Sequence, residues 1–380
     1  MSRKPGSLKA IEPTAVAAVW KRSFARQLLA WYRRHKRDLP WRQSSDPYRV
    51  WVSEIMLQQT QVATVVPYFT RFVASFPNVQ SLARADEREV LRHWEGLGYY
   101  RRARQMHRAA RVLVENHAGQ FPDSVEDIGQ LPGIGRYTAG AIASIAFDLP
   151  APILEANTVR LLSRLVAFGG DPATGAGRRQ LWHLAEAILP PRKCGEFNQA
   201  LMELGSLVCT PRAPTCTSCP LADLCVSFER GQQHEIPLVR PKAASESVRE
   251  AAVVVWRNKK VLLRRRLAGE RWAGLWDFLR FPLTAHKQAA VEREILDEVG
   301  RQSGLAVARP KQIATLKHGV TRFRITLDCF TAEWLGGKAK FAGGPCRWVR
   351  PDALEDYPLS VTGRKLGRLV TQAGASNADQ

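Results

Sequence analysis

The spacing of apolar residues changes once along the chain. From Ala15 to about Arg230 apolar residues recur at intervals of three and four, with Pro or Gly at the breaks. This period predicts a succession of amphipathic helices. Beyond it lie short β-branched or alternating runs at residues 251–256, 260–266 and 322–335, with one helical stretch at 289–304. Strands mixed with a helix predict an α+β fold for this second part.

These two patterns predict two domains. The 380 residues exceed the usual length of one domain, and 45% hydrophobic residues suffice for two cores. Residues 236–247 are polar and contain proline, which indicates a linker. We therefore expect a mainly α domain at 15–235 and an α+β domain at 248–370.

The charge balance narrows the class of partner. With 56 Lys+Arg against 35 Asp+Glu, the formal charge of +21 would repel itself without an anionic partner. Nucleic acid is the simplest such partner, and an anionic membrane surface is the next. The sequence contains no apolar run of about 18 residues that could span a bilayer and no apolar secretion signal at its start. We expect a soluble, cytoplasmic, nucleoid-associated protein with no membrane partner.

Four of the seven cysteines crowd into one short segment. They are spaced C-x6-C-x2-C-x5-C, at Cys209, Cys216, Cys219 and Cys225. In a reducing compartment such crowding favours a metal over disulfides, and four thiolates suit zinc or an iron-sulfur cluster. Structural zinc commonly uses two CxxC pairs, whereas here only one pair is so spaced. Unrelated buried thiols are the alternative, and ordinary packing is expected of the other three, Cys194, Cys329 and Cys346.

Two further segments carry residue types suited to DNA phosphates. Gly133 and Gly135 stand in a turn before a helix, where backbone N–H groups can approach a phosphate closely. A tight connection between helices is the alternative interpretation of this turn. Four arginines share one predicted helix face, which could follow a DNA backbone or simply face solvent: Arg101, Arg104, Arg108 and Arg111.

Together these motifs resemble the MutY family of adenine DNA glycosylases, within the endonuclease III superfamily. The resemblance rests on LPGIGRYTA, GLGYYRRAR, WVSEIMLQQTQV and the cysteine spacing, and it covers roughly Ser23 to Val370. It implies a helix-hairpin-helix glycosylase domain with a 4Fe-4S loop at 209–225, then a MutT/Nudix-like domain that inspects the base opposite adenine. The implied partner is double-stranded DNA with 8-oxoguanine:A or G:A mispairs, bound by a monomer that hydrolytically removes adenine in base excision repair.

The resemblance implies a catalytic role for Glu54. An acid that protonates adenine makes it a better leaving group, and apolar neighbours could keep a carboxyl protonated near neutral pH. A lone glutamate on an amphipathic helix is otherwise a solvated residue.

At a second catalytic position the sequence departs from the family. The family pattern PILDGNVxR is PILEANTVR here, so Glu155 stands at the aspartate position and Asn157 matches the asparagine. A carboxylate there would stabilise the positive charge that develops on the sugar. Its longer side chain shifts the charge, and misplacement of this kind can cost roughly 100-fold in rate. The alternative is an acid that caps the helix starting near NTVRLLSRL.

Tyr137 stands where bifunctional relatives carry the lysine that forms a Schiff base. A phenol cannot form an imine, but it can hydrogen-bond a carboxylate or the developing charge. We therefore predict base removal without an efficient lyase step.

The resemblance also assigns residues that contact DNA or the base. Arg42 and Trp41 match residues that line the adenine pocket, while Gln59 and Tyr99 match wedges inserted into the duplex. Trp41 and Tyr99 could instead be core aromatics, and Gln59 a surface amide.

In the second domain, residues 293–300, REILDEVG, echo half of a Nudix box. Its other half is missing, because Leu279 and Ala285 stand where the box needs Gly and Glu, so a structural helix is favoured over a hydrolase site. A Phe-Ser-His loop of many relatives aligns with Val320, Thr321 and Arg322, of which Thr321 and Arg322 are the candidates for contact with 8-oxoguanine. Arg322 places a permanent cation where relatives have a neutral or weakly basic ring.

Two rival functions stay open at this point. One is a pyrimidine glycosylase and lyase of the endonuclease III type, which Tyr137 and the extra domain argue against. The other is a catalytically impaired mismatch-binding protein, which the Glu155 departure would permit.

Overall fold

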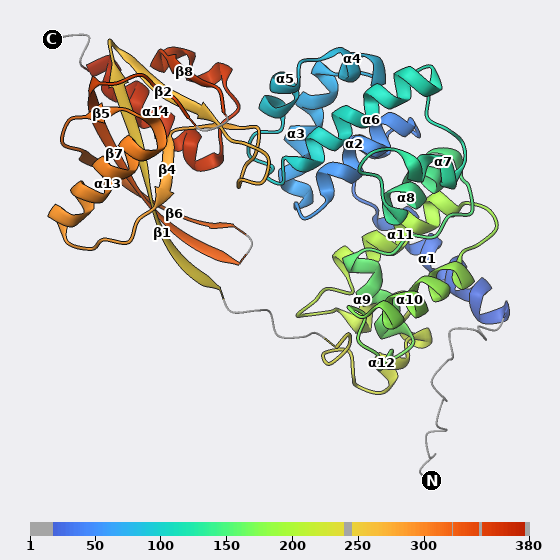
Figure 1. Ribbon diagram of the computed structural model, residues 1–380. Coiled ribbons are helices and arrows are strands. Elements are labelled where there is room, and N and C mark those ends of the chain that lie inside the picture. Colours follow the sequence, from blue (N-terminus) through green and yellow to red (C-terminus); the bar gives the residue numbers. More distant parts are fainter. Residues whose placement is uncertain (1–17, 239–244, 321, 342–343, 377–380) are drawn as a thin grey trace. The chain divides into compact units, whose positions relative to one another are not determined.

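A computed structural model describes residues 18–238, 245–320, 322–341 and 344–376 (Figure 1). The chain divides into two compact units. The first comprises Met1–Arg84 and Gln105–Pro241, and the second Ala85–Arg104 and Lys242–Gln380. Residues 85–104, which the sequence pattern grouped with the helical domain, thus pack with the second unit.

Between residues 18 and 238 the described chain is helical, as its apolar spacing predicted. Among the described residues no helix is long and apolar enough to cross a membrane. The helices in chain order are α1 (Ala18–His35), η1 (Pro40–Arg42), α2 (Pro47–Leu57), α3 (Val62–Ser75), α4 (Val79–Arg84), α5 (Glu87–His93), α6 (Arg101–His117), α7 (Val125–Gln130), α8 (Arg136–Phe147), α9 (Ala156–Leu165), α10 (Gly175–Ile188), α11 (Cys194–Leu207), η2 (Cys216–Ser218), η3 (Ala222–Leu224) and α12 (Val226–Glu229).

The core of the first unit sets the position of the segment before α9. Phe24 of α1 packs edge-to-face on Phe197 of α11, with ring centroids 5.7 Å apart. Within α8, Gly140 lies so close to the chain leading into α9 that an added Cβ would come within 2.4 Å of the carbonyl oxygen of Pro152. A side chain at Gly140 would therefore push away the segment that carries Glu155.

The second unit is a mixed sheet with helices. Besides residues 85–104, its elements are β1 (Glu246–Arg257), β2 (Lys260–Arg265), β3 (Trp276–Asp277), β4 (Leu279–Pro282), α13 (Gln288–Ser303), β5 (Ala306–Val307), β6 (Lys311–Val320), β7 (Phe323–Gly336), β8 (Cys346–Val349), η4 (Pro351–Asp356) and α14 (Val361–Ser376). Strand β1 begins inside the expected linker range 236–247, because it pairs in parallel with β7 from Glu246 opposite Phe323. Strand β6 and helix α14 were not predicted; β6 is largely solvent-exposed and so lacks a continuous apolar pattern.

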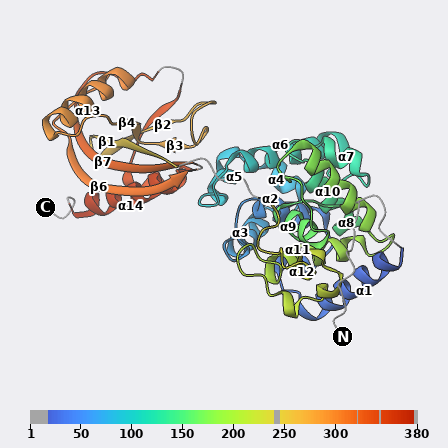
Figure 2. The same cartoon turned by 90° about the horizontal axis from the view of Figure 1, so that it is seen from below.

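Alternation along β1 builds two apolar faces. Val253 packs in one cluster with Ile295 of α13, whereas its neighbour Val254 packs in another with Leu366 of α14. The sheet therefore lies between α13 and α14 (Figure 2). The observed helical unit followed by an α+β unit agrees with the predicted fold class.

Candidate active site

A buried carboxyl on α2 meets a phenol on α8. Glu54 is 5% exposed, and the Tyr137 hydroxyl donates a hydrogen bond to its Oε2 at 2.5 Å. Burial raises the pKa of Glu54 to about 7; the Tyr137 hydrogen bond and the Arg42 charge oppose this rise, and the Glu155 charge adds to it. Burial and the nearby Glu54 charge also raise the pKa of Tyr137 well above its ordinary value, so the phenol stays a donor. Glu54 can hold a proton near neutral pH and deliver it to a base.

A second carboxylate is fixed at the start of α9. The Glu155 side chain accepts hydrogen bonds from the backbone N–H of Asn157 and of Thr158, both at 2.9 Å. Thr158 Oγ1 accepts the N–H of Glu155 in return, which completes a capping box. Burial raises the pKa of Glu155, while the hydrogen bonds from Asn157 and Thr158 and the charge of Arg160 oppose that rise.

Glu155 therefore both caps a helix and lies close enough to Glu54 for their charges to interact. N–H donors favour the ionised form of Glu155, whereas burial favours the protonated form of Glu54. The pair can thus supply one acid and one carboxylate to the same reaction.

Helix α9 connects this carboxylate to the cysteine segment. Arg160 donates to Asn157 Oδ1 at 2.9 Å and to the carbonyl oxygen of Cys209 at 2.7 Å. One turn further, Arg164 donates to the carbonyl oxygen of Thr210 at 2.7 Å and to Cys209 Sγ at 3.4 Å. Displacement of the cysteine segment would therefore shift the residues at the start of α9.

The four clustered cysteines line one cavity, together with Arg164 and apolar side chains from α9. All four thiols are free of disulfides. Burial raises the pKa of Cys219 to about 12, so a thiolate there needs a bound cation to compensate. In the described parts of the chain no three His, Cys, Asp or Glu side chains converge in a way that could hold a single metal ion. Four thiols that line one cavity are a donor set suited to a thiolate-bound metal centre.

Arg42 belongs to a buried ion-pair network. Its guanidinium donates to both oxygens of Glu203, at 3.0 and 2.8 Å, and Arg37 shares the same carboxylate at 2.7 Å. Glu203 is completely buried, and although burial opposes ionisation, hydrogen bonds from Arg37 and Arg42 hold its pKa at about 2. Trp41, which the resemblance placed in the base pocket, is 7% exposed and packs edge-to-face on Phe69, with ring centroids 5.4 Å apart.

None of the sequence motifs contains Glu203. It lies in the second half of α11, in the largely apolar run at residues 200–207. A lone acid in such a stretch is the one sign that could have drawn notice, because a buried carboxylate requires a charged partner.

The glycine-rich turn joins α7 to α8. Gly133 adopts φ +79°, and an added Cβ would lie 2.5 Å from Gln105 Cβ, so only glycine fits. Gly135 is the N-cap of α8, offers no side-chain cap, and has open space where a Cβ would stand. The first N–H groups of α8 can therefore donate to an anion.

Gln59 and Tyr99 are both exposed and both adopt left-handed backbone conformations, with φ values of 58° and 48°. Such values are uncommon outside glycine and store local strain. Of the four arginines expected on one face of α6, Arg101, Arg108 and Arg111 are exposed, whereas Arg104 lies 3.8 Å from a carboxylate oxygen of Glu87.

The Tyr99 segment is tied into the second unit by polar contacts. Glu95 accepts hydrogen bonds from Nε and Nη2 of Arg364 in α14, at 2.6 and 2.8 Å. The backbone N–H of Leu359 also donates to Glu95 at 3.3 Å, and the Tyr100 hydroxyl donates to the Leu359 carbonyl oxygen at 3.3 Å. These contacts hold the chain on either side of residues 96–99.

Comparison with known proteins identifies the family. Residues 52–187 match the model of the HhH-GPD superfamily of base excision DNA repair proteins, and residues 251–368 match a NUDIX domain model. An adenine DNA glycosylase of Mus musculus is 36% identical over 400 residues, covering 91% of this chain and 78% of that relative. One from Buchnera aphidicola subsp. Schizaphis graminum is 37% identical over 259 residues, covering 68% of this chain and 75% of that relative. The chain belongs to the adenine DNA glycosylase family.

Membership confirms the predicted DNA N-glycosylase with a helix-hairpin-helix domain and a NUDIX-like domain. Among solved structures, a thermostable thymine-DNA glycosylase is similar, with a TM-score of 0.51 and 31% sequence identity, covering 56% of this chain and 98% of that chain.

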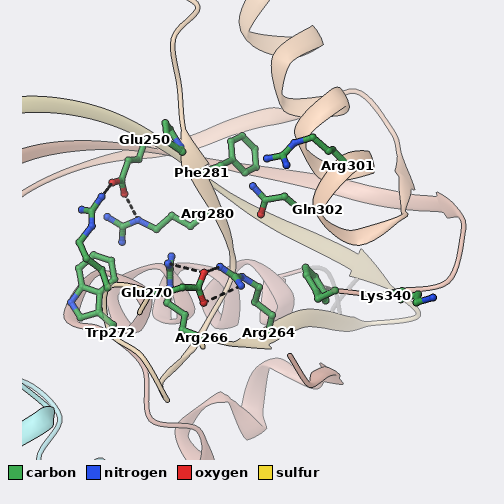
Figure 3. Close-up of a pocket in the computed structure, with 13 residues that line it drawn as sticks. Glu250, Arg264, Arg266, Glu270, Trp272, Arg280, Phe281, Arg301, Gln302 and Lys340 are labelled. Carbon is green, nitrogen blue, oxygen red and sulfur yellow. Dashed lines mark hydrogen bonds and ion pairs between the residues drawn. The ribbon is translucent and has the colours of Figure 1, made fainter. Parts of the chain in front are cut away.

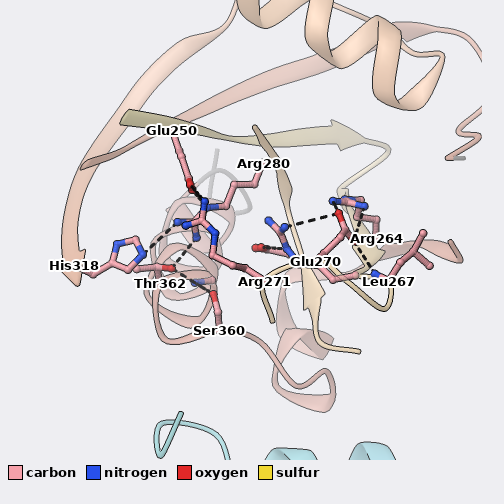
Figure 4. Close-up of polar contacts among 12 residues, drawn as sticks. Glu250, Arg264, Leu267, Glu270, Arg271, Arg280, His318, Ser360 and Thr362 are labelled. Carbon is pink, nitrogen blue, oxygen red and sulfur yellow. Dashed lines mark hydrogen bonds and ion pairs between the residues drawn. The ribbon is translucent and has the colours of Figure 1, made fainter. Parts of the chain in front are cut away.

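The β6–β7 hairpin of the second unit carries the residues expected near the opposite base. Thr321 lies outside the described residues. Arg322 is exposed, lies 5.0 Å over the Phe323 ring, and its Nε is 3.8 Å from Glu246. His318, which pairs with Ile325 close to the turn of the hairpin, has its pKa lowered to about 4 by burial and by the nearby Arg280, so its ring is neutral. Figure 4 shows His318 beside Arg280, which also reaches Thr362 and Glu250.

Proposed function

We propose that this protein hydrolyses the N-glycosidic bond of adenine mispaired with 8-oxoguanine or guanine in double-stranded DNA. The observation that carries the proposal is a pair of neighbouring carboxyl groups, Glu54 with a pKa raised to about 7 and Glu155 held by two backbone N–H donors. A glycosylase needs an acid for the departing base and an anion for the sugar it leaves behind.

In the reaction, Glu54 donates its proton to the adenine ring as the bond from C1′ to the base breaks and its electron pair leaves with the base. Positive charge then develops on the sugar, and the Glu155 carboxylate stabilises it. A water molecule then forms the new bond to C1′ and releases a proton. This proton replaces the one that Glu54 gave to the base. Asn157 and the first turn of α9 hold Glu155, and Tyr137 orients Glu54.

The position of Tyr137 argues against the pyrimidine glycosylase and lyase alternative. Its hydroxyl is engaged with Glu54, and a phenol forms no Schiff base with the sugar. Base removal is therefore the main reaction.

The test is single-turnover base release from matched duplexes. We expect adenine to be released from 8-oxoguanine:A and G:A duplexes and more slowly from T:A. Release of oxidised pyrimidines instead would support the lyase alternative, and tight mismatch binding without release of any base would support the impaired binding protein.

Tyr137→Phe should move the pH profile of adenine release. Activity should fall as pH rises through about 7, because Glu54 must be protonated and its folded pKa lies there. The phenol stabilises the Glu54 carboxylate, so its removal should raise this pKa and shift the falling limb to higher pH. Single-turnover rates between pH 5 and about 9 would measure the shift; an unmoved limb would show that Tyr137 does not act on Glu54.

We further propose that Cys209, Cys216, Cys219 and Cys225 hold a 4Fe-4S cluster. The cavity they share, their unpaired thiols and the cationic Arg164 beside Cys209 support this assignment. Bound there, the cluster would fix the position of the cysteine segment that α9 contacts. Its role would be structural, because hydrolysis of the N-glycosidic bond requires no electron transfer.

Cys219→Ser should remove the iron and the brown absorption of the purified protein, and it should lower the unfolding temperature because metal binding stabilises the fold. Cys346→Ser, in the second unit, is the matched control and should keep the iron. Zinc in place of iron in the native protein would overturn the assignment.

The wedge role proposed for Tyr99 depends on the Glu95–Arg364 contacts. Glu95→Gln should lower adenine release about tenfold or more by loosening residues 96–99, since misplacement of about 1 Å is costly. Arg92→Gln is the matched control. Arg92 precedes Glu95 in the same segment, and its substitution removes a contact with the C-terminal part of the chain, to Asp356 at 3.9 Å. This exposed pair contributes little, so near-native rates are expected.

A double-mutant cycle makes the Glu95 prediction specific. In a Tyr99→Ala background, Glu95→Gln should have little further effect on adenine release if it acts through the wedge. Fully additive losses would contradict this role for Glu95.

Recognition of 8-oxoguanine is proposed for the β6–β7 hairpin. The exposed guanidinium of Arg322 and the neutral His318 near the hairpin turn support a surface that offers hydrogen-bond donors to a base. Arg322→Ala should narrow the difference in adenine release between 8-oxoguanine:A and G:A duplexes.

A further inference from the structure

The second unit contains a cavity that adenine excision does not use. Its volume is about 680 Å³, within the range of small-molecule sites. Six cationic side chains line it against the two carboxylates Glu250 and Glu270: Arg264, Arg266, Arg271, Arg280, Arg301 and Lys340. We call it the arginine cavity (Figure 3).

The inner guanidinium groups are held in fixed orientations. Arg280 pairs with Glu250 at 2.5 Å, and Arg266 pairs with Asp277 at 2.8 Å. Arg264 donates from both terminal nitrogens to Glu270, but among the described residues its buried Nε has no hydrogen-bond partner. Buried donors without a partner are costly, so a ligand that accepts this hydrogen bond would be favoured.

The outer cations lie at the rim. Arg301 and Gln302 come from the C-terminal end of α13, across the cavity from Arg264, and Lys340 extends from another edge (Figure 3). Within the described residues, the Lys340 ammonium has no ion-pair partner. The cavity therefore combines guanidinium groups held by carboxylates, Arg301 included, with the ammonium of Lys340, an arrangement that suits an oxyanion with several charges.

The acids of α13 that could bind magnesium are engaged elsewhere. Glu292 pairs with Arg309 at 2.7 Å, and Glu298 pairs with Arg301 at 2.7 Å. Glu294 accepts hydrogen bonds from the backbone N–H groups of Thr284 and Ala285. None of these carboxylates lines the arginine cavity. The positive charge available to a ligand there comes from side chains.

From this geometry we infer that the arginine cavity binds a free phosphate-bearing anion, such as pyrophosphate or a nucleotide, directly and without a metal ion. Guanidinium groups hydrogen-bond phosphate oxygens in pairs, and the unpartnered Arg264 Nε adds one more donor. This binding is separate from excision, because the lining residues belong to the second unit and include none of the residues around Glu54.

Calorimetric titration of the full-length protein with pyrophosphate in the presence of a chelator tests the inference. We expect binding by the native protein and at least a tenfold loss of affinity in the double variant Arg301→Gln/Lys340→Gln, since it removes two charge-assisted contacts. Arg309→Gln is the matched control: it removes an exposed arginine outside the cavity and should bind as the native protein does. Added magnesium, which itself complexes pyrophosphate, should not strengthen binding by the native protein.

Three outcomes would overturn the inference. Equal pyrophosphate affinity in native and double-variant proteins would mean attraction to the basic surface in general, and binding only with magnesium would mean a metal site. If pyrophosphate does not bind while the double variant, but not Arg309→Gln, weakens duplex binding, the cavity serves the DNA backbone instead. Adenine release at saturating protein should be native-like in both variants, which separates this test from that of the proposed function.

Discussion

Replacement of Glu54 by glutamine should reduce single-turnover adenine release by roughly 10²–10⁴, the usual contribution of a general acid. Glutamine keeps the size of the side chain and can still accept the Tyr137 hydrogen bond, but it carries no acidic proton. Because Glu54 is 5% exposed, the substitution changes the chemistry of the site and leaves the surface that meets DNA intact.

Duplex affinity is the control for this loss. Glu54→Gln should bind an 8-oxoguanine:A duplex as the native protein does, and its unfolding temperature should stay close to native. A rate within a few-fold of native at pH 6 would contradict the assignment of Glu54 as the acid. Recovery of the rate at low pH would show that solvent acid substitutes for it.

The second large effect is expected at Glu155. Glu155→Gln should lower adenine release by about 10²–10³, since the anion facing the sugar is lost. The substitution also weakens a helix cap, which costs about 1 kcal/mol of stability. Glu155→Asp keeps the charge and can cap a helix, so its rate reports only the reach of the side chain.

A matched capping variant separates chemistry from stability. Thr174 caps α10 in the same unit, accepting the N–H of Gly177 at 3.1 Å. Thr174→Ala should lose comparable stability but keep the native rate of adenine release. If Glu155→Gln excises as fast as native, Glu155 is only a cap. If the native protein releases no adenine while Glu155→Asp does, residue 155 is at the family's catalytic position but the native chain is not a working glycosylase.

The capping box around Glu155 gives a physical reason why a departure from the family pattern can be accommodated. Ala156 and Thr158 form the first turn of α9, and the Thr158 hydroxyl completes the capping box that aims the carboxylate. The same helix, through Arg160 and Arg164, contacts the cysteine segment. We therefore expect damage to that segment to be transmitted to the position of Glu155.

Local pattern alone predicted much of this protein. Helical periodicity predicted the helices of the first unit, β-branched and alternating runs predicted β1 and β7, and short motifs indicated the family. Each of these properties depends on residues close together in the chain. The same motifs pointed to Glu54, Tyr137 and Glu155, and a hydrogen bond from the phenol to a carboxylate was one of the two roles predicted for Tyr137.

Contacts between distant residues were decided only by the tertiary structure. Glu203 joins Arg37 and Arg42 from more than 160 residues away, and Glu95 meets Arg364 across most of the chain. Glu155 caps α9 and at the same time lies near enough to Glu54 for their charges to interact, which no motif could reveal. Burial and partner choice depend on packing between elements, and a pKa such as that of Glu54 follows from both. Sequence spacing determines which residues are available to a site, but only the packed fold sets their distances, their hydration and therefore their charge.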